Sequence, residues 1–263
     1  MSVRSEADLF RRGTETLVAS WEEYSHGAAG AFVQRLSGVA VAVFPNEPER
    51  AVYNNALLTR DLLAAERTTG IDAMEAAYAA AGVARFAAWV HESDEAMRAD
   101  LEQRGYTLDT STRAMAMPLD HIRLPRPDVG LAPPDWAEHL RLAGVPPNLL
   151  GGADPHAYHV LIARLGDENV ATAMAFDHGG DCGIYNTGTL ERARRRGLAT
   201  ALTALHVHDA LARGCQTASL QSTEMAQRVY AAVGFRDLGR ILEYVPRRSS
   251  EPWPDGCPRP QAC

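Results

Sequence analysis

The sequence predicts an α/β (α+β) fold made of two similar domains in tandem. Apolar runs typical of strands alternate along the chain with alanine-rich or amphipathic runs typical of helices. The 263 residues are more than the roughly 100–200 of one ordinary domain. A proline-rich stretch also interrupts the pattern near the middle of the chain. Together these features favour two α/β domains joined by a linker.

The first half carries a mixture of helix and strand patterns. Apolar residues within 1–29 recur at a spacing compatible with one or two amphipathic helices. The alanine-rich run that ends at Gly82 is typical of a helix, and glycine at this place is a common helix stop. The remaining elements are expected as strands at 38–44, 51–58 and 86–90, a helix at 94–103 and a strand at 106–119.

Periodic patterns lapse between residues 120 and 134, where prolines concentrate, so we place the linker there. The predicted domains are therefore 1–122 and 123–248, followed by a flexible, proline-rich tail at 249–263. The elements expected in the second half are a helix at 135–144, paired strands at 158–166 and 169–180, a strand from 182, helices at 198–214 and 223–234, and strands at 215–221 and 240–246.

Composition limits the function. The net charge of -7 argues against a nucleic-acid partner, because phosphate backbones are bound by basic surfaces. No apolar run is long enough to span a membrane, and the first residues do not resemble a secretion signal, so we expect a cytoplasmic protein with no membrane partner. The four cysteines lack C-x-x-C spacing and nearby histidine ligands, which predicts reduced thiols and no metal site.

The most informative stretch is NTGTLERARRRGLATA, at 186–201, where a strand runs through an arginine-rich turn into a helix. Helix N-termini present unpaired N–H groups and a partial positive charge. Small residues such as Gly197 and Ala199 allow a ligand to approach the backbone, and arginines add forked donors. This pattern predicts an anion site that suits a pyrophosphate, and the P-loop pattern of nucleotide hydrolases is absent from the sequence.

The two halves repeat one order of features. Ser93-Asp94, a helix, Gly105-Tyr106 and a strand in the first half match Ser222-Thr223, a helix, Gly234-Phe235 and a strand in the second. This order predicts a tandem duplication.

Extending the repeat backwards sets residues 67–72 against the arginine turn, with Asp72 in place of Ala199. A carboxylate there would repel a phosphate. Leu101 likewise stands in place of Tyr230. We therefore expect the first copy to lack a cofactor site.

The second half resembles the GNAT superfamily of acetyl-CoA-dependent N-acetyltransferases. Arg194, Gly197 and Ala199 fit its Arg/Gln-x-x-Gly-x-Gly/Ala pattern between strand and helix. Tyr230, followed by Gly234-Phe235, fits its second motif. The resemblance covers about 129–246, and the first half looks like a degenerate copy, as in tandem members of the superfamily. It implies two domains, each a mixed, mostly antiparallel twisted sheet flanked by helices.

The resemblance also implies roles for individual residues. Tyr230 would be the general acid that protonates the leaving thiolate, close to the cofactor sulfur. A backbone N–H near Thr189 or Leu190 would stabilise the oxyanion of acyl transfer. The strand at 187–190 would pair with the pantetheine arm, and the turn would hold the pyrophosphate. The implied cofactor contacts are Thr187, Gly188, Thr189, Leu190, Arg194, Arg195, Arg196, Gly197, Leu198, Ala199, Thr200, Ser222 and Tyr230.

The sequence departs from the superfamily pattern in two places. Ser222 or Thr223 stands where an asparagine is common, and the strand has no obvious glutamate to act as the base. A water chain from backbone carbonyls and Glu243 are equal candidates for the base. Cys182 has no basic partner readable from the sequence, which disfavours an acyl-cysteine route.

Other polar residues have plainer interpretations. His206 and His208 point to different faces of one helix, so they predict surface or boundary positions rather than a zinc pair. Tyr158, Tyr185 and Glu243 are candidates for the acceptor pocket, and the sequence does not rank them.

The sequence as a whole predicts an acetyl-CoA-dependent N-acetyltransferase that acts on a small-molecule amine by direct attack in a ternary complex. The expected co-substrate is acetyl-CoA or another acyl-CoA, without a metal, and the protein is expected to be a monomer or homodimer. The alternative is a non-catalytic acyl-CoA-binding sensor or interaction protein.

Overall fold

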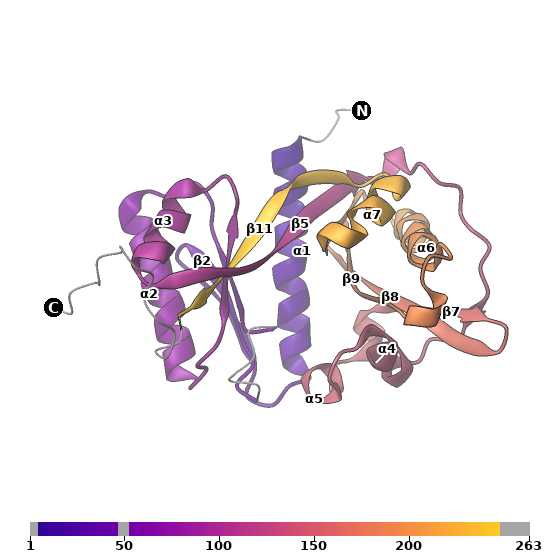
Figure 1. Cartoon of the computed structure of the whole chain (residues 1–263), viewed down its shortest axis with the longest axis horizontal. Coiled ribbons are helices and arrows are strands. Elements are labelled where there is room, and N and C mark those ends of the chain that lie inside the picture. The colour runs from indigo at the N-terminus through magenta and orange to yellow at the C-terminus, as the bar shows by residue number, and fades with distance from the viewer. Residues whose placement is uncertain (1–4, 47–52, 248–263) are drawn as a thin grey trace. The chain divides into compact units, whose positions relative to one another are not determined.

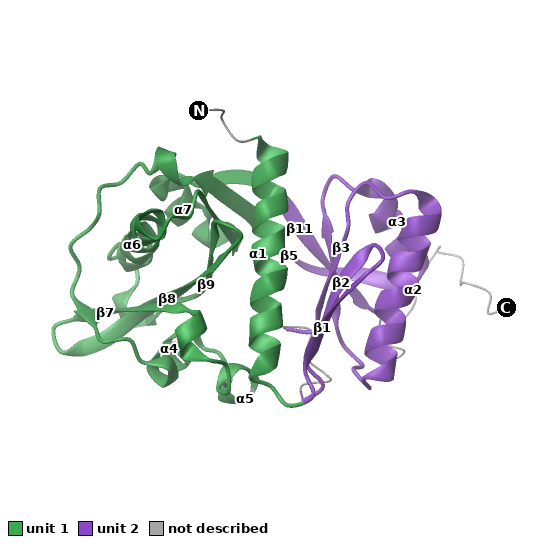
Figure 2. Ribbon diagram, turned by 180° about the vertical axis from the view of Figure 1, so that it is seen from behind, with its two compact units in different colours: residues 1–29, 112–239 green, residues 30–111, 240–263 purple. Residues whose placement is uncertain are grey.

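The structure, a computed structural model, describes residues 5–46 and 53–247 (Figure 1). It divides into two compact units, which Figure 2 colours separately. Unit 1 comprises residues 1–29 and 112–239, and unit 2 comprises residues 30–111 and 240–263. The predicted tail at 249–263 lies outside the described residues.

Unit 1 contains a mixed sheet with the strand order β5-β10-β9-β8-β7-β6. Neighbouring strands are antiparallel except β9 and β10, which are parallel. The strands are β5 (Tyr106–Pro118, in this unit from Thr112), β6 (Leu131–Ala132), β7 (His159–Leu165), β8 (Glu168–His178), β9 (Asp181–Thr189) and β10 (Thr217–Ser222).

Helices cover both faces of this sheet. On one face, α6 (Leu198–Ala212) buries leucines against alanines of β8, and α7 (Gln227–Val233) packs beside α6. On the other face, α4 (Trp136–Ala143) lies against β7, β8 and β9, preceding the short α5 (Pro147–Leu150). The 21-residue α1 (Glu6–His26) lies against β8, β9 and β10. Gly13 makes this approach possible, because a Cβ there would lie 2.8 Å from the Cβ of Ser219.

Unit 2 has the strand order β1-β2-β3-β4-β11. Here β3 and β4 are parallel and the other pairs are antiparallel. A core that includes Tyr78, Leu101 and Tyr244 is buried between the sheet and two helices. The elements are β1 (Phe32–Leu36), β2 (Val39–Val43), β3 (Asn55–Leu58), α2 (Ala64–Ala80), β4 (Ala87–His91), α3 (Glu95–Gln103) and β11 (Arg236–Pro246, in this unit from Arg240).

The two units share one topology. Each has three antiparallel strands, a helix, a strand parallel to the third, a second helix and an antiparallel closing strand. The last strand of each half of the sequence pairs with a strand from the other half. β5, from the first half, pairs with β10, and β11, from the second half, pairs with β4. The predicted fold class, mixed and mostly antiparallel sheets flanked by helices, is confirmed.

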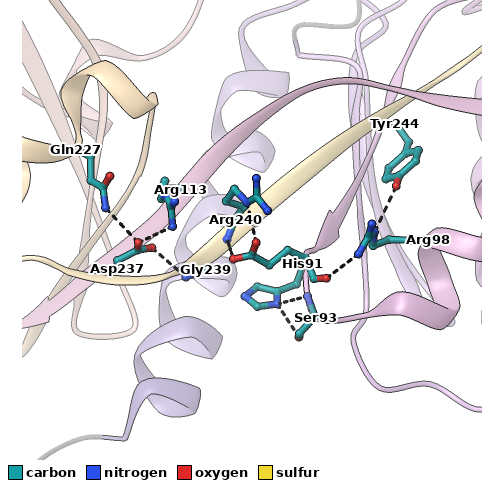
Figure 3. Close-up of polar contacts among 10 residues, drawn as sticks. His91, Ser93, Arg98, Arg113, Gln227, Asp237, Gly239, Arg240 and Tyr244 are labelled. Carbon is teal, nitrogen blue, oxygen red and sulfur yellow. Dashed lines mark hydrogen bonds and ion pairs between the residues drawn. The ribbon is translucent and has the colours of Figure 1, made fainter.

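Polar contacts hold β11 at both of its ends (Figure 3). In unit 1, the Asp237 carboxylate accepts hydrogen bonds from Arg113 at 2.6 Å and from Gln227 at 3.1 Å. In unit 2, Arg98 donates to the Tyr244 hydroxyl at 3.4 Å. This long strand is therefore anchored separately within each unit.

The compact units differ from the domains expected at 1–122 and 123–248. The first helix groups with the C-terminal half because it packs on β8, β9 and β10. The two closing strands each change unit along their length, after Ser111 and after Gly239. Pairing between distant strands decides these boundaries, and local sequence patterns do not report it.

The alignment of the two halves also needs correction. Residues 67–72 are not a turn but part of α2, where Arg67 pairs with Asp100 at 2.6 Å and Asp72 pairs with Arg104 at 2.5 Å. The counterpart of the arginine turn is the connection between β3 and α2, at residues 59–63. Sequence reasoning also missed β1, whose residues are partly exposed, and the two-residue β6 within the predicted linker.

Candidate functional site

The central feature of unit 1 is the divergence of its two parallel strands. Pairing between β9 and β10 runs from Asp181–Thr217 to Gly183–Ser219 and ends there within the described residues. Beyond this point β9 stays paired with β8, and β10 stays paired with β5. The side of β9 that faces away from β8 therefore has N–H and C=O groups without a strand partner. An extended ligand can pair with such an edge.

Most of the predicted pantetheine contacts lie on this diverging part of β9. Thr187, Gly188 and Thr189 are partly exposed, and Leu190 follows directly. Gly188 also has a structural role, because a Cβ there would lie 2.3 Å from the carbonyl oxygen of Leu142 in α4. The glycine thus allows α4 to pack closely against one face of the strand.

A bulge interrupts β9 just before these residues. The register pairs Thr172 with Gly188 but Met174 with Tyr185, so Ala173 alone faces two residues, Asn186 and Thr187. Asn186 has φ 48°, the left-handed conformation that asparagine tolerates better than most residues. Bulges change the direction of side chains and often lie beside functional sites.

The arginine turn leads from β9 into α6. Arg194, Arg195 and Arg196 are exposed, and Arg195 has φ 62°. Gly197 is the N-cap of α6 with φ 76°, no side chain caps the helix, and a Cβ on Gly197 would meet no atom within 4 Å. The turn therefore combines a positive charge with free helix N–H groups and open space, which suits an anion.

The first residues of α6 differ in their exposure to solvent. Leu198 is buried against the sheet, which anchors the turn, whereas Ala199 and Thr200 are partly exposed. The predicted phosphate contacts at 194–200 thus occupy one continuous segment. Its side-chain and backbone donors are the kind that bind pyrophosphate.

Tyr230 comes from α7 and is buried, with 8% of its surface exposed. Burial raises the pKa of its phenol, and a hydrogen bond with Thr187 partly opposes this shift. Its ring also meets Phe235 edge-on, with the ring centroids 6.2 Å apart. The structure thus brings Tyr230 together with the diverging strand, and the phenol is protonated at neutral pH.

Ser222 lies at the end of β10 and is buried, and its hydroxyl donates to the Thr223 carbonyl at 2.8 Å. The Ser222 hydroxyl can therefore accept a hydrogen bond from a ligand but has no free proton to donate. Glu243, a candidate base, lies in unit 2 on β11. Burial, helped by the nearby Asp109 carboxylate, raises the pKa of Glu243 to about 7. A carboxyl with that pKa exchanges protons near neutral pH.

The cysteines of the described part of the chain, Cys182 and Cys215, are free and buried. Burial raises the pKa of both thiols, that of Cys215 to about 11. Neither thiol is therefore ionised near neutral pH, as a nucleophilic cysteine must be. The other two cysteines lie outside the described residues.

The two histidines of α6 differ from each other. His206 is buried rather than at the surface, and burial lowers the pKa of its imidazole to about 4. His208 is hydrogen-bonded with the Leu124 carbonyl at 2.9 Å. No group of three or more histidine, cysteine or acidic residues within 5–46 and 53–247 is arranged to hold a metal ion.

Two aromatic candidates for the acceptor pocket lie in unit 1, where Tyr158 is buried and Tyr185 is partly exposed. Tyr158 stacks on Trp136, with ring centroids 5.3 Å apart, and on Tyr24. Tyr185 folds back so closely over its own strand that a Cβ on Gly183 would lie 2.2 Å from its hydroxyl oxygen. A cavity of about 790 Å³ lies near the C-terminal half of α6, and its lining includes Trp136 and Tyr158 but none of the predicted cofactor contacts.

The site as a whole is a diverged strand pair beside an uncapped helix N-terminus in an α/β unit. Residues 126–235 match the model of the acetyltransferase (GNAT) family. No functionally curated protein matches the sequence. No helix in the described ranges, 5–46 and 53–247, is long and apolar enough to cross a membrane.

Solved structures of similar fold cover nearly the whole chain. A GCN5-related N-acetyltransferase from Kribbella flavida is 16% identical, with 90% of this chain and 96% of that chain covered at a TM-score of 0.68. One from Sphaerobacter thermophilus is 18% identical, with 92% and 93% covered at 0.57. A tandem GNAT protein from the clavulanic acid biosynthesis pathway is 10% identical, with 92% and 96% covered at 0.57. At these identities the likeness is one of fold.

Proposed function

We propose that this protein is an acetyl-CoA-dependent N-acetyltransferase that transfers the acyl group to the amine of a small molecule. The observation that carries the proposal is the divergence of β9 from β10 beside the uncapped N-terminus of α6. The family match supports acyl transfer as the class of reaction. Most of the residues proposed to bind the cofactor lie along this strand and turn, whereas Ser222 lies on β10 and Tyr230 on α7.

The residues present fit an acyl-CoA. The backbone N–H groups of 194–200 would hold the pyrophosphate, because the helix N-terminus carries no side-chain cap and Gly197 leaves space for the ligand. The unpaired edge at 187–190 would hydrogen-bond the pantetheine arm. A backbone N–H near Thr189 or Leu190 would face the thioester carbonyl and stabilise the oxyanion.

The chemistry follows from direct attack. An alkyl ammonium, with a pKa of about 10, must first lose a proton to become a nucleophile. The amine nitrogen then attacks the thioester carbon, the C–N bond forms and the C–S bond breaks, and the nitrogen loses a second proton to solvent to give the neutral amide. Tyr230 gives its proton to the departing thiolate and regains one from solvent. A water chain and Glu243 remain equal candidates for the base that deprotonates the amine.

The activity test measures thiol release from acetyl-CoA with a panel of small amines, amino acids and aminoglycosides. Release that depends on an acceptor, with an acetylated product found by mass spectrometry, is the expected result. Binding of acetyl-CoA without turnover on any acceptor favours the alternative, a non-catalytic acyl-CoA sensor. Absence of any CoA binding refutes both.

We also propose that the chain is a tandem duplication whose first copy lacks a cofactor site. In unit 2 the N-terminus of α2 is already occupied by a carboxylate, because Glu66 accepts the N–H of Leu63 at 2.8 Å. The Glu66 carboxylate would therefore repel an anion at the N-terminus of α2, whereas the corresponding N-terminus of α6, in the second copy, has free N–H groups. Isothermal titration is expected to give one acetyl-CoA per chain, and two equivalents would overturn this proposal.

The remaining proposals concern partners. The net charge of -7 favours encounter with a cationic amine and disfavours nucleic acid. We propose a cytoplasmic monomer or homodimer without a membrane or metal partner. Light scattering after gel filtration tests the oligomeric state, and a larger assembly would contradict it.

A further inference from the structure

Asn186 stands out among the residues beside the proposed site. Only four described non-glycine residues have positive φ, and two of them, Asn186 and Arg195, lie in the segment that runs from β9 into α6. Strained backbone of this kind persists where the surrounding structure enforces it, and it clusters at ligand sites. Asn186 occupies the first position of the bulge, directly before Thr187.

The direction of neighbouring side chains places the bulge on the ligand side of β9. Gly188 abuts α4, and the side chain of Tyr185 lies toward Ser20 of α1, so both residues face the helices α1 and α4. The bulge adds one residue to the alternation of side chains along the strand, so the two residues between them lie together on the opposite face. On that face Thr187 meets the phenol of Tyr230.

The side-chain amide of Asn186 carries a donor that the protein does not use. Its Nδ2 atom is buried and has no hydrogen-bond partner among the described residues, although the side chain as a whole is partly exposed. A buried donor without a partner destabilises a fold, so its presence calls for an explanation. An acceptor on a bound ligand would satisfy this donor.

We propose that Asn186 contacts the acyl group, and that its Nδ2 donates a hydrogen bond to the carbonyl oxygen of the bound thioester. This inference rests on the proposed function. In the bulge, Asn186 directly precedes Thr187, the residue whose side chain interacts with the phenol that would protonate the thiolate. The Asn186 amide would be a second hydrogen-bond donor to the carbonyl oxygen, in addition to the backbone N–H near Thr189 or Leu190. Its hydrogen bond would strengthen as negative charge develops on that oxygen.

The test compares two stable ligands by isothermal titration. Acetonyl-CoA keeps a carbonyl but cannot transfer its acyl group, and CoA has no such carbonyl. The variants are Asn186→Gly, which accepts positive φ but has no amide, and Asn186→Asp, which keeps the shape but replaces the donor with a carboxylate. Wild type is expected to prefer acetonyl-CoA by about five- to tenfold, and both variants are expected to lose most of that preference, keeping only what the backbone N–H provides, while binding CoA within about twofold of wild type.

Thermal unfolding of the free protein separates a ligand contact from a packing role. Asn186→Gly is expected to leave the midpoint unchanged or raise it, because it removes an unpaired donor and relieves the backbone. Asn169→Gly is the control, since the Asn169 amide does have a partner, Glu138 at 3.1 Å, and its loss lowers the midpoint. If Asn186→Gly has a lowered midpoint and an intact preference for acetonyl-CoA, the inference about Asn186 is overturned but the proposed function is not. Absence of CoA binding to wild type overturns the proposed function as well.

Discussion

The phenol of Tyr230 lies beside the side chain of Thr187, at the point where β9 has already separated from β10. The two residues come from elements far apart in sequence, a helix and a diverging strand. Their contact places a protonated phenol, with its pKa raised by burial, next to the edge that we propose binds the pantetheine arm. A general acid must hold its proton at working pH, and this environment ensures that it does.

Tyr230→Phe is expected to lower the rate of acyl transfer by about 10- to 1,000-fold while leaving acetyl-CoA affinity nearly unchanged. The substitution removes only the hydroxyl and keeps the ring that packs on Phe235. Steady-state kinetics and titration measure the two quantities. Tyr106→Phe is a matched control, because that buried tyrosine bonds Glu75 in unit 2 and its loss should reduce stability without a matching fall in rate. An unchanged rate in Tyr230→Phe would reduce Tyr230 to a packing residue.

Gly197→Asp is expected to weaken CoA binding at least tenfold, because a carboxylate at the N-terminus of α6 takes the place of the pyrophosphate. Gly197→Ala separates charge from backbone strain. Gly82→Ala is its control, since both glycines have positive φ, 76° and 68°, and open space around a Cβ. The two alanine variants should lose about 1 kcal/mol of stability each. Equal CoA affinity in Gly197→Asp and Gly197→Ala contradicts the pyrophosphate assignment.

Glu243→Gln is expected to stabilise the protein above neutral pH. The pKa of this carboxyl is raised to about 7 by burial and by Asp109, so the folded state holds its proton more tightly than the unfolded state does. Wild-type stability therefore falls as pH rises from about 4.5 to about 7, by up to about 3 kcal/mol, and the neutral amide does not share this loss. Denaturation midpoints at pH 4.5 and 8 measure the difference. If Glu243 is also the base, the same variant lowers the rate, and a normal rate would favour the water chain.

Much of the site could be predicted from sequence because its signals are local. Gly197 and the arginines before it define the turn by residue type, and the structure places the start of α6 directly after that glycine. Tyr230 lies four residues before Gly234-Phe235, and the structure places it on the predicted helix.

The features that sequence reasoning missed depend on contacts between distant residues. Nothing local in Asn186 reveals the bulge, which appears only when β9 is aligned with β8. The exchange of β5 and β11 likewise depends on non-local strand pairing. The alignment of the halves failed because the connection before α2 spans 59–63 whereas that before α6 spans 190–197, so a constant offset carries α2 residues into the turn.

His206→Leu is expected to make folding stability less sensitive to acid. Burial lowers the pKa of His206 to about 4, below the ordinary value of 6.5, so the unfolded state binds the proton more tightly. Wild type should therefore lose stability as pH falls from about 6.5 to about 4, by up to about 3 kcal/mol from this residue. Urea midpoints at pH 7 and 4.5 measure the change, with His156→Ala as a control at an exposed histidine. Because burial also lowers the pKa of His139 to about 4, the stability of His206→Leu should still depend on pH in this range. A variant slope equal to that of wild type would show that His206 is protonated in the folded protein.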